Sequence, residues 1–165
     1  MDIINYKPIG VIKSPFKKSD LIPRQAIAAP NVFGRVQIYD EYAEGLMDLD
    51  GFSHIVLVYH LHLANFVELD SYPPWDSSKR GIFSTCSPYR PNPIGISVVR
   101  LDKLEGTTLY ISCIDMVDDT PVLDIKPYIP SLNPSQKVSL GWLTENIEQM
   151  KMGKSEILRV NSHDQ

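Results

Sequence analysis

The sequence is poor in several features that identify large classes of proteins. Among 165 residues there are only two cysteines, Cys86 and Cys113, and aromatic residues make up 9%. So few cysteines exclude a disulfide-rich scaffold, and we expect both thiols to be free. The most apolar stretch, residues 54–66, is interrupted by polar residues, and the N-terminal segment lacks the charge pattern of a secretory signal. These absences favour a cytoplasmic protein without a membrane span.

Sequence motifs for common cofactor and nucleophile sites are also missing. No G-x-G-x-x-G follows a strand-like segment, and the chain has no phosphate loop, no G-x-S-x-G and no C-x-x-C. His54, His60 and His62 have the same parity on one strand-like segment, but His54 and His60 would lie about 20 Å apart in an extended strand. No acid or cysteine beside them completes a ligand set, so we expect no metal. The pattern favours His60 or His62 as a wall of a pocket.

What the sequence does contain is a series of short β-rich segments separated by proline-rich loops. With 43% apolar and 22% charged residues, it has the composition of one globular domain. Strands are expected at 6–14, 34–39, 53–62, 81–85 and twice within 95–117, around a turn at Glu105-Gly106. Short helices are expected at 40–52 and 141–150, loops at 15–34, 68–81 and 118–135, and a frayed tail at 161–165. The loop at 118–135 is expected to contain a short extended piece.

No alternation of strand and helix occurs, which argues against a doubly wound sheet. The predicted fold is mainly β: a single antiparallel β-barrel-like domain over residues 1–165, not Rossmann-like, with one or two short helices. We expect its core within residues 3–130 and a C-terminal helix and tail in 131–165. The central strand is expected at 53–62, because this segment is apolar on both faces.

The net charge of −4 hides a strong segregation along the chain. Residues 1–39 and 77–103 each carry a net +4, whereas residues 40–76 carry −8 and residues 104–165 carry −4. If the basic side chains gather on one side of the fold, they could meet a phosphate backbone. Solvated loop charges explain the same pattern, and charge alone favours that explanation. The candidate residues are Lys13, Lys17, Lys18, Arg24, Lys79, Arg80, Arg90 and Arg100.

The stretch "STCSPYRPNPIGIS" at 84–97 places three prolines within six residues, directly before a predicted strand. Each proline fixes its own φ and restricts the residue before it, so the loop has little entropy to lose when a ligand binds. Arg90 and Asn92 lie inside this rigid frame, and Gly95 permits a close backbone approach. The loop is therefore either a rigid connection or a binding surface, and the two polar residues keep the second interpretation open.

A second cluster lies at residues 115–128, where four carboxylates fall within ten positions. Such carboxylates commonly cap turns, and this role is favoured for Asp119. They can also face a cation or accept a proton from an amine. Both roles stay open for Asp115, Asp118 and Asp124.

The segment "FSTCSPYRPNPIGISVVRL" resembles the signature of the TsaA-like family, tRNA N6-adenosine methyltransferases that act beside the anticodon. The resemblance continues in "IGVIKSPFK", "PRQ", "GLMDLDGFSHIVLVYHLH" and "DMVDDTPVLDIKPYIP", and so extends to about Pro130. It implies a β-barrel, a homodimer and S-adenosylmethionine as methyl donor. The implied substrate is tRNA whose adenosine 37 carries a threonylcarbamoyl group, methylated at the exocyclic N6.

The resemblance also implies site residues by position. Those expected to bind the donor are Gln25, Ala26, Ile27, His62, Leu63, Cys86, Ile96, Ile111, Ser112, Cys113 and Ile114. Those expected to serve substrate or catalysis are Arg90, Asn92, Asp124, Lys126 and Tyr128. The chain departs from the family at Cys86, where Arg is usual, and at Asp119, where Gly is usual. Tyr72 and Trp75 are candidate anchors of the dimer.

Two other functions fit the same residues. One is a non-catalytic barrel that binds S-adenosylmethionine or a nucleotide and regulates a partner, which the change to Cys86 favours slightly. The other is methyl transfer to a small molecule. For the leading function, Asn92 or a carboxylate is expected to orient or deprotonate the poorly nucleophilic acceptor nitrogen.

Overall fold

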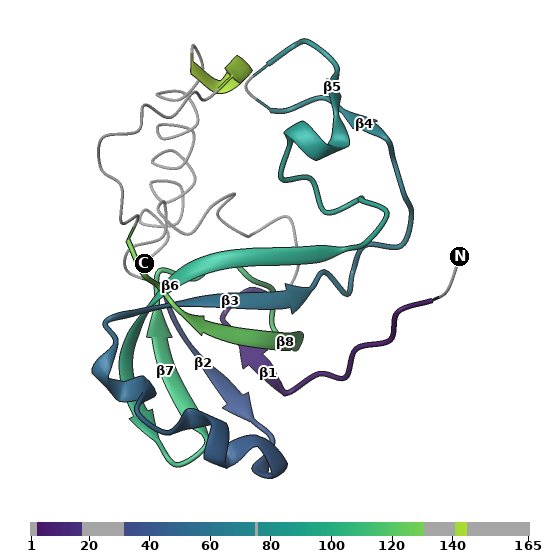
Figure 1. Cartoon of the computed structure of the whole chain (residues 1–165). Coiled ribbons are helices and arrows are strands. Elements are labelled where there is room, and N and C mark those ends of the chain that lie inside the picture. The colour runs from purple at the N-terminus through teal and green to yellow at the C-terminus, as the bar shows by residue number, and fades with distance from the viewer. Residues whose placement is uncertain (1–2, 18–31, 75, 131–140, 145–165) are drawn as a thin grey trace, which may run out of the picture.

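A computed structural model describes residues 3–17, 32–74, 76–130 and 141–144. Six antiparallel strands close into a barrel in the order β1-β2-β7-β6-β3-β8 (Figure 1). This confirms the predicted fold class. The barrel strands are β1 (Gly10–Lys13), β2 (Phe33–Ile38), β3 (His54–His60), β6 (Ile94–Glu105), β7 (Thr108–Ser112) and β8 (Thr120–Pro127).

Alternation of side chains along the strands explains why this barrel forms. In β3, Ile55, Leu57 and Tyr59 face the interior and are buried, while the residues between them are less buried. Such a period of two places one set of side chains in the core. β3 pairs with β6 on one side and β8 on the other, and every other strand of the closed barrel likewise has two partners. The turn after Glu105 has Gly106 at φ 56°, a conformation that favours glycine.

The segment 81–85 forms no strand of the barrel, contrary to expectation. Arg80–Gly81 is the short strand β5, which pairs only with β4 (Asp70–Ser71), and Ile82–Ser84 forms the 3₁₀ helix η5. The hydroxyls of Ser84 and Thr85 donate to the carbonyls of Gly81 and Ile82, 2.8 and 3.0 Å away. Such local side-chain hydrogen bonds favour a turn over an extended ladder.

Residues 118–135, expected to be a loop with one short extended piece, contain a full barrel strand over most of their described part. β8 occupies Thr120–Pro127, pairs with β1 and β3, and closes the barrel. Its alternation was hidden by prolines near both ends and by a register shift opposite Val58 and Tyr59. Asp119, directly before the strand, has φ 63°. The usual family residue at this position, glycine, adopts that conformation without strain.

The single helix expected at 40–52 is instead two 3₁₀ helices, η3 (Asp40–Leu46) and η4 (Leu49–Gly51). Asp40 is the first residue of η3, and Tyr39 before it makes no side-chain cap. Leu46 is buried in the core. We call this end of the barrel, lined by Ile9, Ile38 and Leu46, the helix-covered end.

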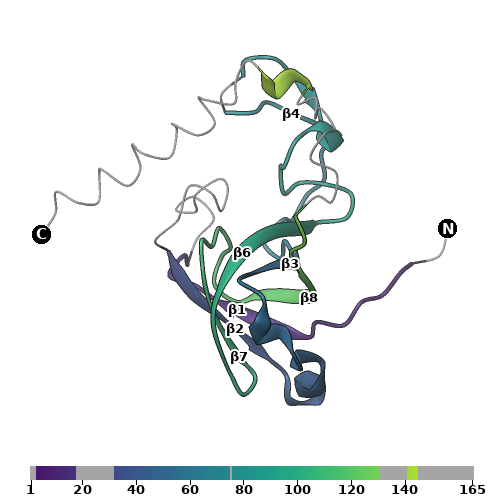
Figure 2. The ribbon, with the colours of Figure 1, turned by 60° about the vertical axis from the view of Figure 1, so that its left-hand side comes forward.

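At the opposite end, which we call the loop end, β1, β3 and β7 finish and β6 and β8 begin. The segment between β3 and β6 carries β4 and β5 and stands away from the barrel in both views (Figures 1 and 2). Of the predicted C-terminal helix, Gly141–Thr144 forms the 3₁₀ turn η6, while residues 145–150 and the tail lie outside the described residues. In the described part of the chain, no helix has the length and apolarity to cross a bilayer.

Candidate functional site at the loop end of the barrel

The loop that follows β3 and the proline loop lie side by side at the loop end. The Leu61 amide donates to the carbonyl of Pro93 at 2.7 Å, and the Glu68 amide donates to the carbonyl of Tyr89 at 2.9 Å. The rings of Phe66 and Tyr89 stack with their centroids 3.9 Å apart. These contacts hold the loop after β3, which contains His62, against the proline loop, so that the two segments together form one side of the loop end.

Arg90 stabilises the proline loop internally. Its guanidinium donates to the carbonyls of Thr85 and Ser87 at 3.0 and 3.2 Å, so its planar group braces the turn. Asn92 is exposed, and its carbonyl accepts from the Ile94 amide at 2.8 Å. The rigidity expected from the prolines is therefore reinforced by an arginine that holds the loop around Asn92.

A buried polar relay connects the barrel interior with the bend after β7. The Tyr59 hydroxyl lies 2.9 Å from the Ser97 hydroxyl, which donates to the Asp115 carboxylate at 2.7 Å. Tyr59 and Ser97 are both buried. A Cβ added at Gly95 would lie 2.2 Å from the Tyr59 ring, so glycine is required for this close approach. The relay thus links the proline loop to the acidic bend.

Two titratable side chains at the loop end, Tyr59 and His62, are held in their neutral forms. Burial raises the pKa of the Tyr59 phenol above its ordinary range, and the Asp115 carboxylate raises it further, so the phenol stays neutral. Burial lowers the pKa of His62, as does the nearby His60, so the imidazole is uncharged at neutral pH. The Nδ1 of His62 lies 3.5 Å from the Thr120 hydroxyl.

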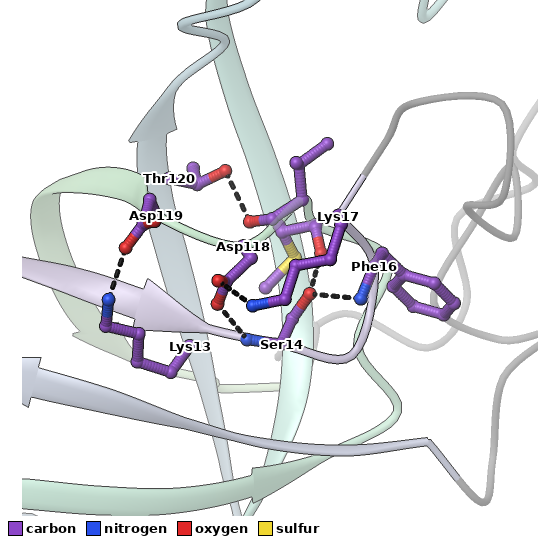
Figure 3. Close-up of polar contacts among 9 residues, drawn as sticks. Lys13, Ser14, Phe16, Lys17, Asp118, Asp119 and Thr120 are labelled. Atoms are coloured by element: carbon purple, nitrogen blue, oxygen red, sulfur yellow. Dashed lines mark hydrogen bonds and ion pairs between the residues drawn. The ribbon is translucent and has the colours of Figure 1, made fainter.

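The acidic bend is joined to the end of β1 by a second set of contacts (Figure 3). Asp118 accepts a 2.9 Å hydrogen bond from the Ser14 amide and pairs with Lys17, and Asp119 pairs with Lys13. The Ser14 hydroxyl donates to the carbonyl of Met116 at 2.7 Å. Burial opposes ionisation of Asp118, but Lys17 and the Ser14 amide outweigh it and lower the pKa of this carboxyl.

The residues expected to bind the donor fall into three groups. His62, Leu63, Cys86 and Cys113 belong to segments of the loop end, and both cysteines are free thiols. Ile111, Ser112 and Ile114 are buried, whereas Ile96 lies on the outer face of β6 and is 67% exposed. Gln25, Ala26 and Ile27 lie outside the described residues.

The residues expected to serve substrate or catalysis divide between two places. Arg90 and Asn92 lie in the proline loop. Asp124 and Lys126 lie in the second half of β8, and Tyr128 comes directly after it, so all three are nearer the helix-covered end. Asp124 pairs with Lys126 at 2.7 Å. Asp124 also lines a hollow of about 360 Å³ beneath η3. The Tyr128 ring meets His54 edge-on, with centroids 6.4 Å apart.

Tyr59 and Ser97 are members of the relay that sequence reasoning did not single out. Ser97 is a polar residue at an inward position of a strand, between apolar Val99 and Gly95. A polar residue at an inward position of a strand needs a hydrogen-bond partner, so the sequence alone could have indicated that Ser97 belongs to a buried polar contact. The sequence could not identify that partner, because it depends on which residues of β3 and of the bend after β7 lie next to Ser97 in the folded barrel.

The fold and these contacts define a class: a closed β-barrel, not Rossmann-like, with a polar site formed by loops at one end. The sequence matches the tRNA-methyltransferase O N-terminal domain over residues 11–133. The chain belongs to the tRNA-methyltransferase O family. This confirms the resemblance found in the proline loop and its flanking motifs.

Related sequences carry two kinds of name. A probable S-adenosyl-L-methionine-binding protein of Pyrococcus abyssi is 46% identical over 154 residues, covering 93% of this chain and 84% of the relative. The human tRNA (adenine(37)-N6)-methyltransferase is 36% identical over 143 residues, covering 80% of this chain and 32% of the enzyme. The chain therefore spans about a third of the human enzyme and most of the archaeal protein.

The crystal structure of TrmO from Pseudomonas aeruginosa superposes with a TM-score of 0.70 at 36% identity, covering 86% of this chain and 63% of that one. A second crystal structure of TrmO gives a TM-score of 0.72 at 37% identity and covers 64% of its chain. The chain thus spans slightly less than two thirds of both solved structures. Because the superpositions cover 86% and 85% of this chain, the similarity to both structures includes the whole barrel.

Proposed function

We propose that this chain is an S-adenosylmethionine-dependent methyltransferase that methylates the exocyclic N6 of an adenosine beside the tRNA anticodon, and that this adenosine carries a threonylcarbamoyl group. The family match and the names of the relatives support the proposal. The observation that carries it is the loop end itself, where the braced proline loop faces a polar wall held by the Tyr59–Ser97–Asp115 relay.

The residues present at the loop end fit the methyl donor. S-adenosylmethionine carries a sulfonium charge, which a carboxylate and neutral groups accommodate and a cation repels. Asp115 supplies a carboxylate, the imidazole of His62 is neutral, and the guanidinium of Arg90 is directed at carbonyls of its own loop. We propose that His62, Cys86 and Asp115 border the bound donor, which supplies an electrophilic methyl group.

In this proposal the protein contributes chiefly by positioning the acceptor. Displacement at a methyl carbon needs the acceptor nitrogen held in line, and orientation alone supplies much of the acceleration. Asn92, exposed on the braced loop, holds the acceptor amide by its side chain, and the rigid loop loses little entropy in doing so.

Incubation with labelled donor tests the proposal. Methyl transfer to threonylcarbamoylated tRNA, and not to the same tRNA without that group, is the expected result. An Asn92→Ala variant should retain donor affinity and lose most of the turnover. Equal labelling of both tRNAs would overturn the proposed substrate, and unchanged turnover in Asn92→Ala would overturn its role.

A second candidate function is favoured by Cys86. This exposed thiol stands where the family usually has arginine, and the archaeal relatives are described as S-adenosyl-L-methionine-binding proteins. A barrel that binds the donor and regulates a partner without catalysis would fit both facts. Tight donor binding with no label transferred to any tRNA would select this function over the first, or direct the search to a small-molecule acceptor.

We propose that the active form is a homodimer in the cytoplasm. The outer side of β3 and β6 presents an aliphatic face, made of Val56, Val58, Ile94, Ile96 and Val98. Asp124 and Lys126 are the Cα partners of Val58 and Val56, so a second copy on this face would approach the predicted catalytic residues of β8. Tyr72, also exposed, is a further predicted anchor, and Trp75 lies outside the described residues.

Light scattering on two matched variants tests the dimer. Ile96→Glu places a charge in the centre of the aliphatic face and should give a monomer. Ile3→Glu, at an exposed isoleucine near the N-terminus, should leave the mass unchanged. A monomeric wild type, or a dimeric Ile96→Glu, would overturn this assembly.

A further inference from the structure

A row of cations and aromatic rings crosses the outer side of the barrel away from the aliphatic face. Strand pairing places Lys13 of β1 opposite Arg35 of β2, and Arg35 opposite Tyr110 of β7. Lys103 of β6 is the next partner of Tyr110. The inward neighbours of these residues, such as Val36 and Leu109, are core residues, so the row faces outward.

An open hollow of about 570 Å³ lies over one end of this row. Part of its lining is made of cations and aromatic rings, which we call the Arg35 surface: Lys13, Lys17, Phe33, Arg35 and Tyr110. The rest of the lining is Ser14, Pro15, Gly34 and Asp118. Phe33 is 67% exposed and Tyr110 is 39% exposed, so both rings leave apolar surface in contact with solvent. Exposed aromatic rings between cations are the composition of surfaces that stack unpaired bases and hold their phosphates.

The charge arrangement of the Arg35 surface points to an anionic ligand. Lys13 pairs with Asp119, and because both side chains are exposed this pair is weak and exchanges readily. Lys17 is exposed, but its partner Asp118 is largely buried, so that pair holds Lys17 more firmly at the edge of the surface. Among the described residues, Arg35 has no carboxylate partner. It lies directly opposite Lys13, and like charges at that position destabilise a strand pair. A bound phosphate would relieve this repulsion.

The Arg35 surface adjoins the candidate site. Phe33 is the Cα partner of Ser112, directly before the acidic bend, and Gly34 faces Ile114 so closely that an added Cβ would lie 2.5 Å from its side chain. Lys17 binds Asp118 within the same bend (Figure 3). A strand of nucleic acid on the Arg35 surface would therefore run toward the loop end.

We propose that the Arg35 surface binds an unpaired stretch of the tRNA, with phosphates at Arg35, Lys13 and Lys17 and bases stacked on Phe33 and Tyr110. This inference rests on the proposed tRNA substrate and adds the surface that delivers it. The pairing with Asp118 and Asp119 leaves only a small net positive charge, so stacking supplies a large share of the affinity. Binding should then favour unpaired over duplex RNA.

Fluorescence anisotropy with a labelled anticodon stem-loop tests the surface. Phe33→Ala should weaken binding by about 5- to 150-fold, the range that corresponds to the loss of one stacked base. Arg35→Gln should weaken it less and lower the slope of log affinity against log salt by about 0.7, as for one lost phosphate contact on a single strand. Lys7→Gln removes one charge from the exposed N-terminal segment and should change affinity less than about twofold.

The outcomes separate the surface from the proposed function. Calorimetric binding of S-adenosylmethionine to each variant serves as the folding control. If the wild type binds and methylates tRNA while Phe33→Ala and Arg35→Gln match it, the surface is wrong and the function stands. If the wild type binds no tRNA, the proposed function falls and this inference with it. Equal affinity for a fully paired stem would overturn the stacking mode.

Discussion

The two ends of the barrel are built from different kinds of residue. All four buried polar side chains in the described part of the chain, those of Ser14, Ser97, Ser112 and Thr120, lie at the loop end. The helix-covered end is closed by aliphatic side chains, among them that of Leu46. The difference indicates that one end contributes mainly stability and the other mainly the site, because buried polar groups must be matched by specific partners.

The largest effect on stability is expected at the helix-covered end. Leu46→Ala removes a core side chain and should lower the free energy of unfolding by about 2–5 kcal/mol. Denaturant unfolding measures this, with Leu69→Ala at an exposed leucine as the control. Donor affinity of the folded variant should stay at the wild-type value. A selective loss of donor binding would show that the two ends are not separate in function.

The polar relay should give the reverse pattern at the loop end. Ser97→Ala leaves the Tyr59 hydroxyl and Asp115 without their shared partner, which should cost about 1–3 kcal/mol of stability. We also expect weaker donor binding and a lower turnover, because the bend that carries Asp115 is no longer held in place. Calorimetry and single-turnover assays measure both, beside Ser78→Ala at an exposed serine. Wild-type donor affinity in Ser97→Ala would make the relay purely structural.

Acid stability should distinguish the bend from the rest of the barrel. The pKa of Asp118 is lowered in the folded state, so its stabilisation is present above about pH 4 and is lost as pH falls through the folded-state pKa. Asp118→Asn removes the ion pair with Lys17 and should cost about 1 kcal/mol at pH 7. The difference from wild type should shrink below pH 4. A difference that stays constant down to pH 2 would contradict this assignment.

The smallest effect is expected at His62. Its pKa is lowered in the folded state, so the unfolded chain takes up the proton first, and stability falls as pH drops below about 6.5 until the folded-state pKa is passed. A charged imidazole should also repel the sulfonium, so donor affinity should fall by less than about tenfold between pH 7.5 and 5.5. His62→Gln should flatten this profile, whereas an unchanged profile would place His62 away from the donor.

Several parts of the fold could be predicted because they depend on local sequence. The β-rich segments at 34–39 and 95–117, with a turn at Glu105-Gly106, indicated strands, and the absence of alternating strands and helices argued against a doubly wound sheet. The sequence indicated only a short extended piece where β8 lies, because the prolines and carboxylates of this segment are typical of loops. The short 3₁₀ helix at Ile82–Ser84 was taken for a strand because a segment as short as 81–85 has too few residues to distinguish the two periods.

The candidate site was predictable only in part. The rigidity of the proline loop follows from its prolines, and its family motif is legible in the sequence. That Arg90 braces its own loop, or that Asp118 holds Ser14, depends on contacts among residues that the backbone brings together. The separation of Asp124 from Asn92 likewise follows from the path of β8 along the barrel.

By itself, the sequence determined the β-strand alternation, the stiff loop before β6 and the family. Only the tertiary structure decided which polar residues meet, because closure of the barrel sets the register of every strand, and a shift of one residue would turn each side chain to the other face. The Tyr59–Ser97–Asp115 relay and the Arg35 surface are both products of that register. Neither could be read before the strands were paired.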